Sequence, residues 1–347
     1  MSNKVLVGMS GGVDSSVSAL LLKQKGYDVI GFTMILHDED ESMESISDAK
    51  KVCNKLGIDH ITCNYVNEFN KRVIDNFVCS YRNCKTPNPC IECNRFLKFG
   101  MMYEKAKELS CDYIATGHYA IIEYDERYNK KVLKKSKSQT KDQSYVLYNI
   151  DSELLDKILL PLGNFSSKDE IRKIARENNL EVASKKDSED ICFIPDNDYA
   201  SFLEKKKGFK PREGNIVNKK GEILGKHKGL YKYTIGQRKG LGISYEVPLY
   251  VIGYNINKNE LIVGKEDELY TKDVYLNNFN NLLGLDINNL NVNAKIRYSA
   301  KEAKATITNE DGIIKVSFEE CQKAVTPGQS LVAYIDDVVV GGGIIEK

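Results

Sequence analysis

A loop rich in glycine and serine lies near the start of the chain, in the stretch GMSGGVDSSV that begins at Gly8. An apolar run at 5–9, typical of a buried strand, precedes the loop, and a helical pattern at 17–22 follows it. A strand-to-helix turn directs backbone N–H groups and the positive end of the helix dipole at one point, where phosphate binds well. The loop also offers hydroxyl donors on Ser10, Ser15 and Ser16. These residues predict a phosphate-binding loop.

The two common phosphate-loop patterns do not match this stretch. The lysine of G-x-x-x-x-G-K-S/T is missing, and so is the spacing of G-x-G-x-x-G. The stretch instead resembles the S-G-G-x-D-S loop of enzymes that split ATP between its α and β phosphates and retain the pyrophosphate. A carboxylate beside phosphates needs a bridging cation, so Asp14 implies Mg²⁺. The residues expected to contact ATP here are Gly8, Met9, Ser10, Gly11, Gly12, Val13, Asp14 and Ser15.

Cysteines supply the second candidate chemistry. Cys90 and Cys93 form a C-x-x-C pair in a proline-rich loop, and Cys192 lies far downstream in a short apolar run. No second C-x-x-C follows, which disfavours zinc, and a thioredoxin-like redox pair does not suit a chain with an ATP loop. We expect a helix to start near Asn94, which would place Cys93 at a helix N-terminus and lower its thiol pKa. The cysteines in regular apolar patterns are read as small buried hydrophobes: Cys53, Cys63, Cys79, Cys111 and Cys321.

Length and composition limit where these groups can act. A chain of 347 residues suggests two or three domains, and a net charge of +1 means that an acidic partner must be met by local basic surface. The sequence shows no secretion signal and no apolar run long enough to cross a membrane. Nine cysteines without a disulfide-framework spacing are expected to be thiols. We therefore expect a cytoplasmic protein.

The pattern of elements indicates an α/β domain followed by β structure. Strand-like runs at 5–9, 29–35, 60–66 and 113–115 alternate with helical patterns at 44–56, 67–80 and 95–109. Such alternation predicts a parallel sheet with helices on both faces. After Pro211 the chain has short β-rich runs, and a weaker break lies near Tyr270. We predict a catalytic domain at 1–202, a small β-rich domain at 203–270 and a C-terminal β-barrel at 271–347.

Three basic clusters could meet an acidic partner. Because lysines bind phosphate without reading sequence, they predict an electrostatic surface for nucleic acid. The clusters are Lys130, Lys131, Lys134, Lys135, Lys137 and Lys141; then Lys205, Lys206, Lys207, Lys210 and Arg212; then Lys226, His227, Lys228, Lys232, Arg238 and Lys239.

Seven sequence blocks in order resemble the tRNA-specific 2-thiouridylase family. They are GMSGGVDSSV, TPNPCIECNRFLKFG, ATGHYA, KDQSYVLY, DSEDICFI, YTIGQRKGLGI and TPGQSLVAY, and they spread over nearly the full length. The resemblance implies the ATP-pyrophosphatase fold and an enzyme that thiolates position 2 of the wobble uridine in tRNA. It also implies ATP, a persulfide from a desulfurase or relay protein, and release of AMP and pyrophosphate.

The same resemblance assigns roles to individual residues. Cys192 matches the cysteine that carries the persulfide, and Cys93 matches the partner nucleophile, which can close a disulfide with Cys192. Met34 and Gly117 match positions that contact ATP. The positions that match tRNA or target-base contacts are Asn88, Pro89, Cys90, His118, Lys141, Asp142, Gln143, Arg297, Tyr298 and Gln329.

One position departs from the commoner family pattern. Many members carry Asp where this chain has Cys90, and a thiol is a poor substitute for a carboxylate in proton transfer. Two alternatives stay open beside the persulfide route, and only the first of them follows from Cys90. Cys90, Cys93 and Cys192 could hold a 4Fe–4S cluster with one open iron, or the chain could be a non-catalytic, nucleotide-regulated RNA-binding protein.

Overall fold

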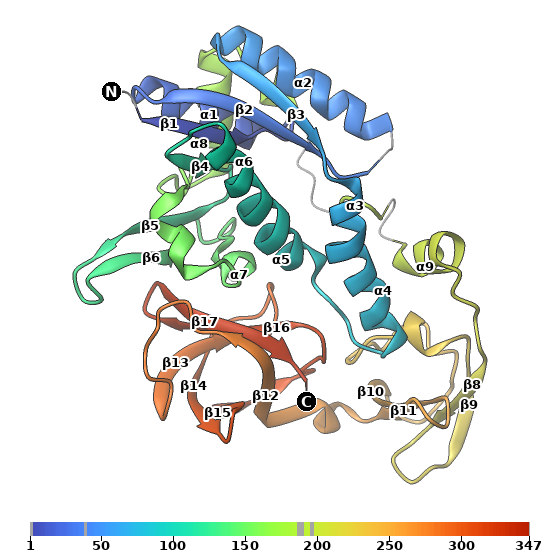
Figure 1. Cartoon of the computed structure of the whole chain (residues 1–347). Helices are drawn as coiled ribbons and strands as arrows, with labels where there is room; N and C mark the ends of the chain where they lie inside the picture. Colours follow the sequence, from blue (N-terminus) through green and yellow to red (C-terminus); the bar gives the residue numbers. More distant parts are fainter. Residues whose placement is uncertain (1–2, 38–39, 186–190, 195–197, 347) are drawn as a thin grey trace.

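The computed structural model describes residues 3–37, 40–185, 191–194 and 198–346. Its first part is a parallel sheet in the order β3-β2-β1-β4-β7, drawn in blue and green at the top of Figure 1. The strands are β1 (Lys4–Gly8), β2 (Asp28–Ile35), β3 (Asp59–Asn64), β4 (Tyr113–Ala115) and β7 (Ile158–Leu159). All neighbouring pairs run parallel, which confirms the predicted sheet.

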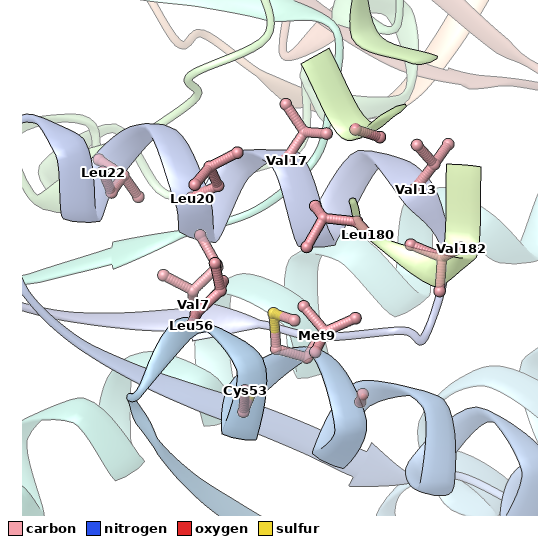
Figure 2. Packing of buried hydrophobic residues seen from close by; sticks show 14 of the residues in the cluster. Val7, Met9, Val13, Val17, Leu20, Leu22, Cys53, Leu56, Leu180 and Val182 are labelled. Carbon is pink, nitrogen blue, oxygen red and sulfur yellow. The ribbon is translucent and has the colours of Figure 1, made fainter. Parts of the chain in front are cut away.

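Side-chain alternation along β1 divides the core into two layers. Val5 and Val7 pack under α1 (Val13–Gln24), α2 (Asp40–Leu56) and α8 (Lys168–Glu177), together with residues such as Leu56 and Leu180. Figure 2 shows this layer around Val7, Met9 and Val17. Leu6 points to the opposite layer, where Phe99 and Met102 cover the sheet. Because β1 is buried on both faces, its sequence reads as a continuous apolar run.

A chain of helical segments leads from β3 to the other domains. It consists of α3 (Val66–Phe69), the π-helical η1 (Asn70–Ile74), α4 (Asp75–Arg82), α5 (Pro89–Cys93), the π-helical η2 (Asn94–Met101) and α6 (Met102–Glu108). Figure 1 shows α4 reaching toward β8–β11 and α5 lying above the barrel. Shorter segments follow: α7 (Ser144–Leu147), η3 (Ser152–Lys157), η4 (Glu181–Ser184) and α9 (Tyr199–Lys207).

The middle of the chain forms a small mixed sheet in the order β10-β11-β8-β9. Its strands are β8 (Gly214–Val217), β9 (Ile223–His227), β10 (Tyr250–Asn255) and β11 (Glu260–Gly264), with turns η6 (Leu230–Lys232) and η7 (Glu266–Leu269) nearby. β8 and β11 run parallel, and the other neighbours run antiparallel.

The last part is a closed β-barrel in the order β12-β15-β14-β13-β16-β17, with β12 pairing back to β17. Its strands are β12 (Tyr270–Asn280), β13 (Leu290–Lys295), β14 (Ala303–Glu310), β15 (Ile313–Lys323), β16 (Ser330–Ile335) and β17 (Val338–Ile345). A hairpin of β5 (Ala120–Asp125) and β6 (Lys130–Lys135) extends this sheet, because Lys134 pairs with Val338. The barrel was predicted, whereas the hairpin that joins it to the first domain was not.

Within the described ranges, no helix is both long and apolar enough to cross a membrane.

Candidate active site

The glycine- and serine-rich loop joins β1 to α1 and is braced from within. The Ser15 and Ser16 hydroxyls both donate to the Gly12 carbonyl, at 3.1 and 2.8 Å, and the Ser10 N–H donates to Ser15 Oγ at 3.2 Å. Ser16 is fully buried, so its hydroxyl shapes the loop. Gly12 caps α1 without a side chain, which leaves the first N–H groups of a 12-residue helix facing outward. This end of α1 suits an anion.

Two glycines let other segments approach this loop closely. Gly11 has φ +70°, and a Cβ there would lie 2.5 Å from the Ser45 carbonyl oxygen of α2. Gly117 follows β4, and its Cβ would lie 2.9 Å from the backbone of Asp14 and Ser15. Any larger side chain at either position would push the loop out of place.

Met34, predicted to contact ATP, lies near the carboxyl end of β2, beside the end of β1 that leads into the loop. Gly117 follows the carboxyl end of β4 on the other side of β1. The predicted nucleotide residues therefore come together at one edge of the parallel sheet, where open α/β sheets bind ligands.

Asp14 has two partners that the sequence did not reveal. Tyr119 Oη donates to Asp14 Oδ1 at 2.7 Å, and the Lys168 ammonium forms an ion pair with Asp14 Oδ2. Tyr119 lies two residues after Gly117, and Lys168 is the first residue of α8. The only signal for Tyr119 was its place in the ATGHYA block, and no sequence pattern linked Lys168 to a loop 154 residues away.

One apolar cluster contains Cys93 and the two residues that follow Cys192. Cys93 is 6% exposed and packs in a cluster that contains Phe193 and Ile194, the two residues after Cys192. Cys192 lies in an exposed turn, and the protein around its sulfur partly desolvates the thiol. This desolvation, with a smaller effect of Cys93, raises the pKa of the Cys192 thiol to about 12. The charge of Cys93 thus reaches Cys192, which is 99 residues away in the sequence.

The predicted position of Cys93 at a helix N-terminus is wrong. The helix begins at Pro89, because Asn88 Oδ1 accepts the Cys90 N–H at 3.2 Å and Pro89 fits the first turn. Cys90 therefore occupies the first turn, and Cys93 lies at the buried end of α5. Burial raises the pKa of the Cys93 thiol above its ordinary value, which is the opposite of the expectation.

Lys98 is a further residue that the sequence analysis did not single out, and its only signal was its place in the TPNPCIECNRFLKFG block. It belongs to the π-helical segment η2, and its charge lowers the pKa of Cys93, of Cys192 and of the His118 imidazole. His118 is buried beside the Phe99 ring, and its Nδ1 lies 2.8 Å from Thr116 Oγ1. Burial and Lys98 hold the pKa of His118 well below its ordinary value, so this imidazole is neutral near pH 7. Lys98 thus acts electrostatically on both thiols and on His118, the residue after Gly117, which approaches the glycine- and serine-rich loop.

In the described ranges, no group of three or more histidine, cysteine or acidic side chains is arranged to hold a metal ion. The trio of Cys90, Cys93 and Cys192 is therefore not a preformed cluster site, and we derive no step through iron. Asp14 is different, since its carboxylate beside the loop is the kind of oxygen ligand that Mg²⁺ prefers.

Several of the predicted tRNA residues lie where the barrel contacts the first domain. Gln329 Nε2 donates to the Thr86 carbonyl at 2.8 Å, next to Asn88 and Pro89. Tyr298 Oη donates to the Asp142 carbonyl at 3.0 Å. Three more of the predicted tRNA residues are sequence neighbours of Asp142 and Tyr298, namely Lys141, Gln143 and Arg297.

Some of these residues also have structural roles. The Asp142 carboxylate accepts the Ser136 N–H at 2.9 Å, and Gln143 Oε1 accepts the Tyr119 N–H at 2.9 Å.

A cavity of about 180 Å³ lies between the first domain and the barrel. It is lined in part by Asn88 and Glu92 of the first domain and by Ser330 of the barrel.

Comparison with known proteins decides the family. Three known domain families match successive segments of the chain. They are a tRNA methyl transferase HUP domain over 3–196, a tRNA methyl transferase PRC-barrel domain over 200–265 and an aminomethyltransferase beta-barrel domain over 269–345. The tRNA-specific 2-thiouridylase MnmA of Clostridioides difficile (strain 630) is 49% identical over 360 residues, covering 100% of this chain and 99% of the relative. The chain belongs to the tRNA-specific 2-thiouridylase family.

A further relative and a solved structure are also similar to the chain. MnmA of Acetivibrio thermocellus is 50% identical over 357 residues, with 99% of each chain covered. Among solved structures, the U34-tRNA thiolase NcsA from Methanococcus maripaludis with its 4Fe–4S cluster is 20% identical, with a TM-score of 0.37, and the match covers 60% of this chain and 69% of that one. The expected fold class, a parallel-sheet domain followed by a β-rich domain and a β-barrel, is confirmed by the matching domains and the sheet topology.

Two lysines of the first basic cluster are paired with acidic side chains. Lys134 lies 3.0 Å from both Glu123 and Asp125 and is 12% exposed. Lys135 pairs with Glu302 at 2.7 Å. The stretch contains no acid in sequence, but the neighbouring strand and the barrel supply acids in space. These two lysines are therefore not the unpaired cations that the sequence predicted, and their contact with nucleic acid stays a prediction.

In the central domain, several cations of the third basic cluster are exposed. Lys228, Arg238 and Lys239 are exposed around the small sheet, whereas Lys232 pairs with Glu204 at 2.6 Å.

Five cysteines were predicted to be small buried hydrophobes. Cys53 is fully buried, as predicted, and Cys63 and Cys111 are half-buried. Cys79 and Cys321 are exposed, so the prediction is wrong for these two.

Proposed function

We propose that this protein uses ATP to replace the C2 oxygen of the wobble uridine of tRNA with sulfur carried by a cysteine persulfide. Its family makes it an ATP-dependent tRNA sulfurtransferase. This activity fits a cytoplasmic enzyme that acts on tRNA and receives sulfur from a persulfide donor. The observations that carry the residue assignments are two close packings. Cys93 packs in one apolar cluster with Phe193 and Ile194, the residues after Cys192, and Gly117, which precedes His118, approaches the backbone of the loop at Asp14.

The loop would bind ATP and activate the uridine. Backbone N–H groups at the start of α1 and the Ser10 hydroxyl would hold the phosphates, and Mg²⁺ would bind the Asp14 carboxylate and neutralise phosphate charge. The uridine O2 would attack the α-phosphorus, forming the adenylate and releasing pyrophosphate. A carbonyl oxygen is a poor leaving group, and adenylation turns it into AMP, a good one.

The two cysteines would then deliver sulfur. The terminal sulfur of the Cys192 persulfide would attack C2 of the adenylated uridine. The Cys93 thiolate would attack the inner sulfur, the electron pair of the S–S bond would pass to the sulfur on C2, and AMP would leave with the original oxygen. The products are 2-thiouridine, AMP and a Cys93–Cys192 disulfide, which a thiol reductant reopens. The shared cluster of Cys93 and the residues after Cys192 supports this pairing.

Two measurements test the proposal. The first is release of AMP and pyrophosphate with tRNA that carries U34, compared with the same tRNA carrying C34. We expect release only with U34 and loss of release in Asp14→Asn.

The second measurement follows labelled sulfane sulfur from a persulfide donor. Cys93→Ser should retain the label on Cys192 without thiolating tRNA, Cys192→Ser should accept none, and Cys321→Ser, an exposed cysteine of β15, should behave as wild type. Turnover that strictly requires reconstituted iron would contradict the persulfide route and favour the cluster alternative.

A further inference from the structure

Lys168 places an ammonium group at the candidate ATP loop. Its side chain is 11% exposed and forms an ion pair with Asp14, the second residue of α1. The Tyr119 hydroxyl holds the other oxygen of Asp14, and the ammonium lies 5.9 Å from the centroid of the Tyr119 ring. The positive group therefore lies at the end of α1 that suits an anion.

The helix that carries Lys168 is fixed against α1. Ser167 caps α8 by accepting the Glu170 N–H, and Ile171 and Ala175 are fully buried in the core layer that contains Val13 and Val17 of α1. Because α8 is capped and anchored, Lys168 is directed at the loop by the fold.

The chemistry of the loop favours such a cation in addition to Mg²⁺. Its sequence lacks the lysine that other phosphate loops carry, and its acidic residue, Asp14, would repel phosphate. Pyrophosphate, the product that the loop would retain, carries several negative charges. A lysine supplied from α8 offsets these charges without a change in the loop motif.

We propose that Lys168 is the phosphate-binding cation of this site. When ATP binds, the ammonium moves from Asp14 to an oxygen of the β- or γ-phosphate, and the Asp14 carboxylate becomes free for Mg²⁺. In this role Lys168 also retains the departing pyrophosphate. The inference rests on the ATP site of the proposed function.

The test compares two nucleotides on the full-length protein by titration calorimetry with Mg²⁺ present. One is the α,β-methylene analogue of ATP, which cannot be split at that bond, and the other is AMP, which lacks the β- and γ-phosphates. Lys168→Gln should weaken the analogue roughly ten- to a hundred-fold, the range expected when one charged hydrogen bond is removed, and leave AMP within about twofold. Lys168→Arg should retain most of the affinity, and Lys173→Gln, an exposed lysine of the same helix, should bind as wild type.

A double variant separates phosphate binding from mere neutralisation of Asp14. Asp14→Asn with Lys168→Gln removes both members of the Lys168–Asp14 ion pair, so it also guards against misfolding of the single variant. The double variant is compared with Asp14→Asn alone, which already lacks the carboxylate. If Lys168 only neutralises Asp14, the two proteins will bind the analogue equally well, and the proposal is overturned. If Lys168 binds phosphate, the double variant will bind the analogue more weakly than Asp14→Asn. Unchanged affinity in Lys168→Gln also overturns the proposal, whereas a wild-type protein that binds no analogue overturns the ATP site itself.

Discussion

Gly117→Ala is expected to damage nucleotide binding through a single added methyl group. The new Cβ would lie 2.9 Å from both the Asp14 carbonyl carbon and the Ser15 nitrogen, about 0.5 Å inside the 3.4 Å at which ordinary contact begins. Both atoms are backbone, so no flexible side chain can give way, and the loop itself must move.

The size of the effect follows from this overlap. Overpacking a well-packed site typically costs about 1 to 3 kcal/mol. If the displaced loop cannot regain its position, the affinity for the α,β-methylene analogue of ATP should fall roughly 5- to 150-fold, because about 1.4 kcal/mol corresponds to a factor of ten.

Titration calorimetry on the full-length protein measures this affinity, and urea unfolding reports any accompanying loss of stability. Gly253→Ala is the matched control, since a Cβ there meets nothing closer than 3.8 Å. Gly117→Ala protein that binds the analogue within about twofold of wild type and unfolds at the same urea concentration would refute the reasoning.

Three further predictions follow from charge and burial. Lys134→Met should lower the melting temperature, because it removes an ion-pair partner from Glu123 and from Asp125, which keeps Arg127, and it should leave the salt dependence of tRNA binding unchanged; a flatter dependence would restore the nucleic-acid role of this lysine. Neutralising Lys228 and Lys239 together should reduce the log–log salt slope by roughly 0.7 to 0.9 for each phosphate that the protein no longer neutralises, and an unchanged slope would exclude this surface. Alkylation of Cys192 should keep rising with pH above pH 8, because a thiol pKa of about 12 leaves little thiolate below it, and Lys98→Met should slow alkylation by raising that pKa further; a plateau near pH 7 would contradict this.

The sequence predicted those parts of the fold whose signals are local. The apolar run that forms β1 could be predicted as a buried strand because its side chains enter two core layers, one on each face of the sheet. The loop was readable because its glycines serve needs visible in the motif, namely a positive φ at Gly11 and close approach of the backbone. The true start of α5 was also readable, since Asn88 and Pro89 form an N-cap and first-turn pair, although the helix was expected to begin later, near Asn94.

What escaped prediction depends on interactions between distant segments. Lys134 looked like part of an unpaired basic run because Asp125 is nine residues away in sequence and becomes its neighbour only through the β5–β6 hairpin. Lys168 reaches Asp14 only because α8 packs beside α1. The raised pKa of Cys93 results from the cluster that closes over it, which the order of residues alone cannot reveal.

The most direct test of the central claim is mass analysis of the nucleosides from tRNA treated with the purified enzyme. The protein is prepared in air, freed of iron and supplied with U34-containing tRNA, ATP, Mg²⁺ and a persulfide donor. We predict a wobble uridine whose mass shows one oxygen replaced by sulfur, and its loss in Cys93→Ser and in Cys192→Ser. An unchanged wobble uridine with the complete mixture, or thiolation that survives in both cysteine variants, would contradict the account.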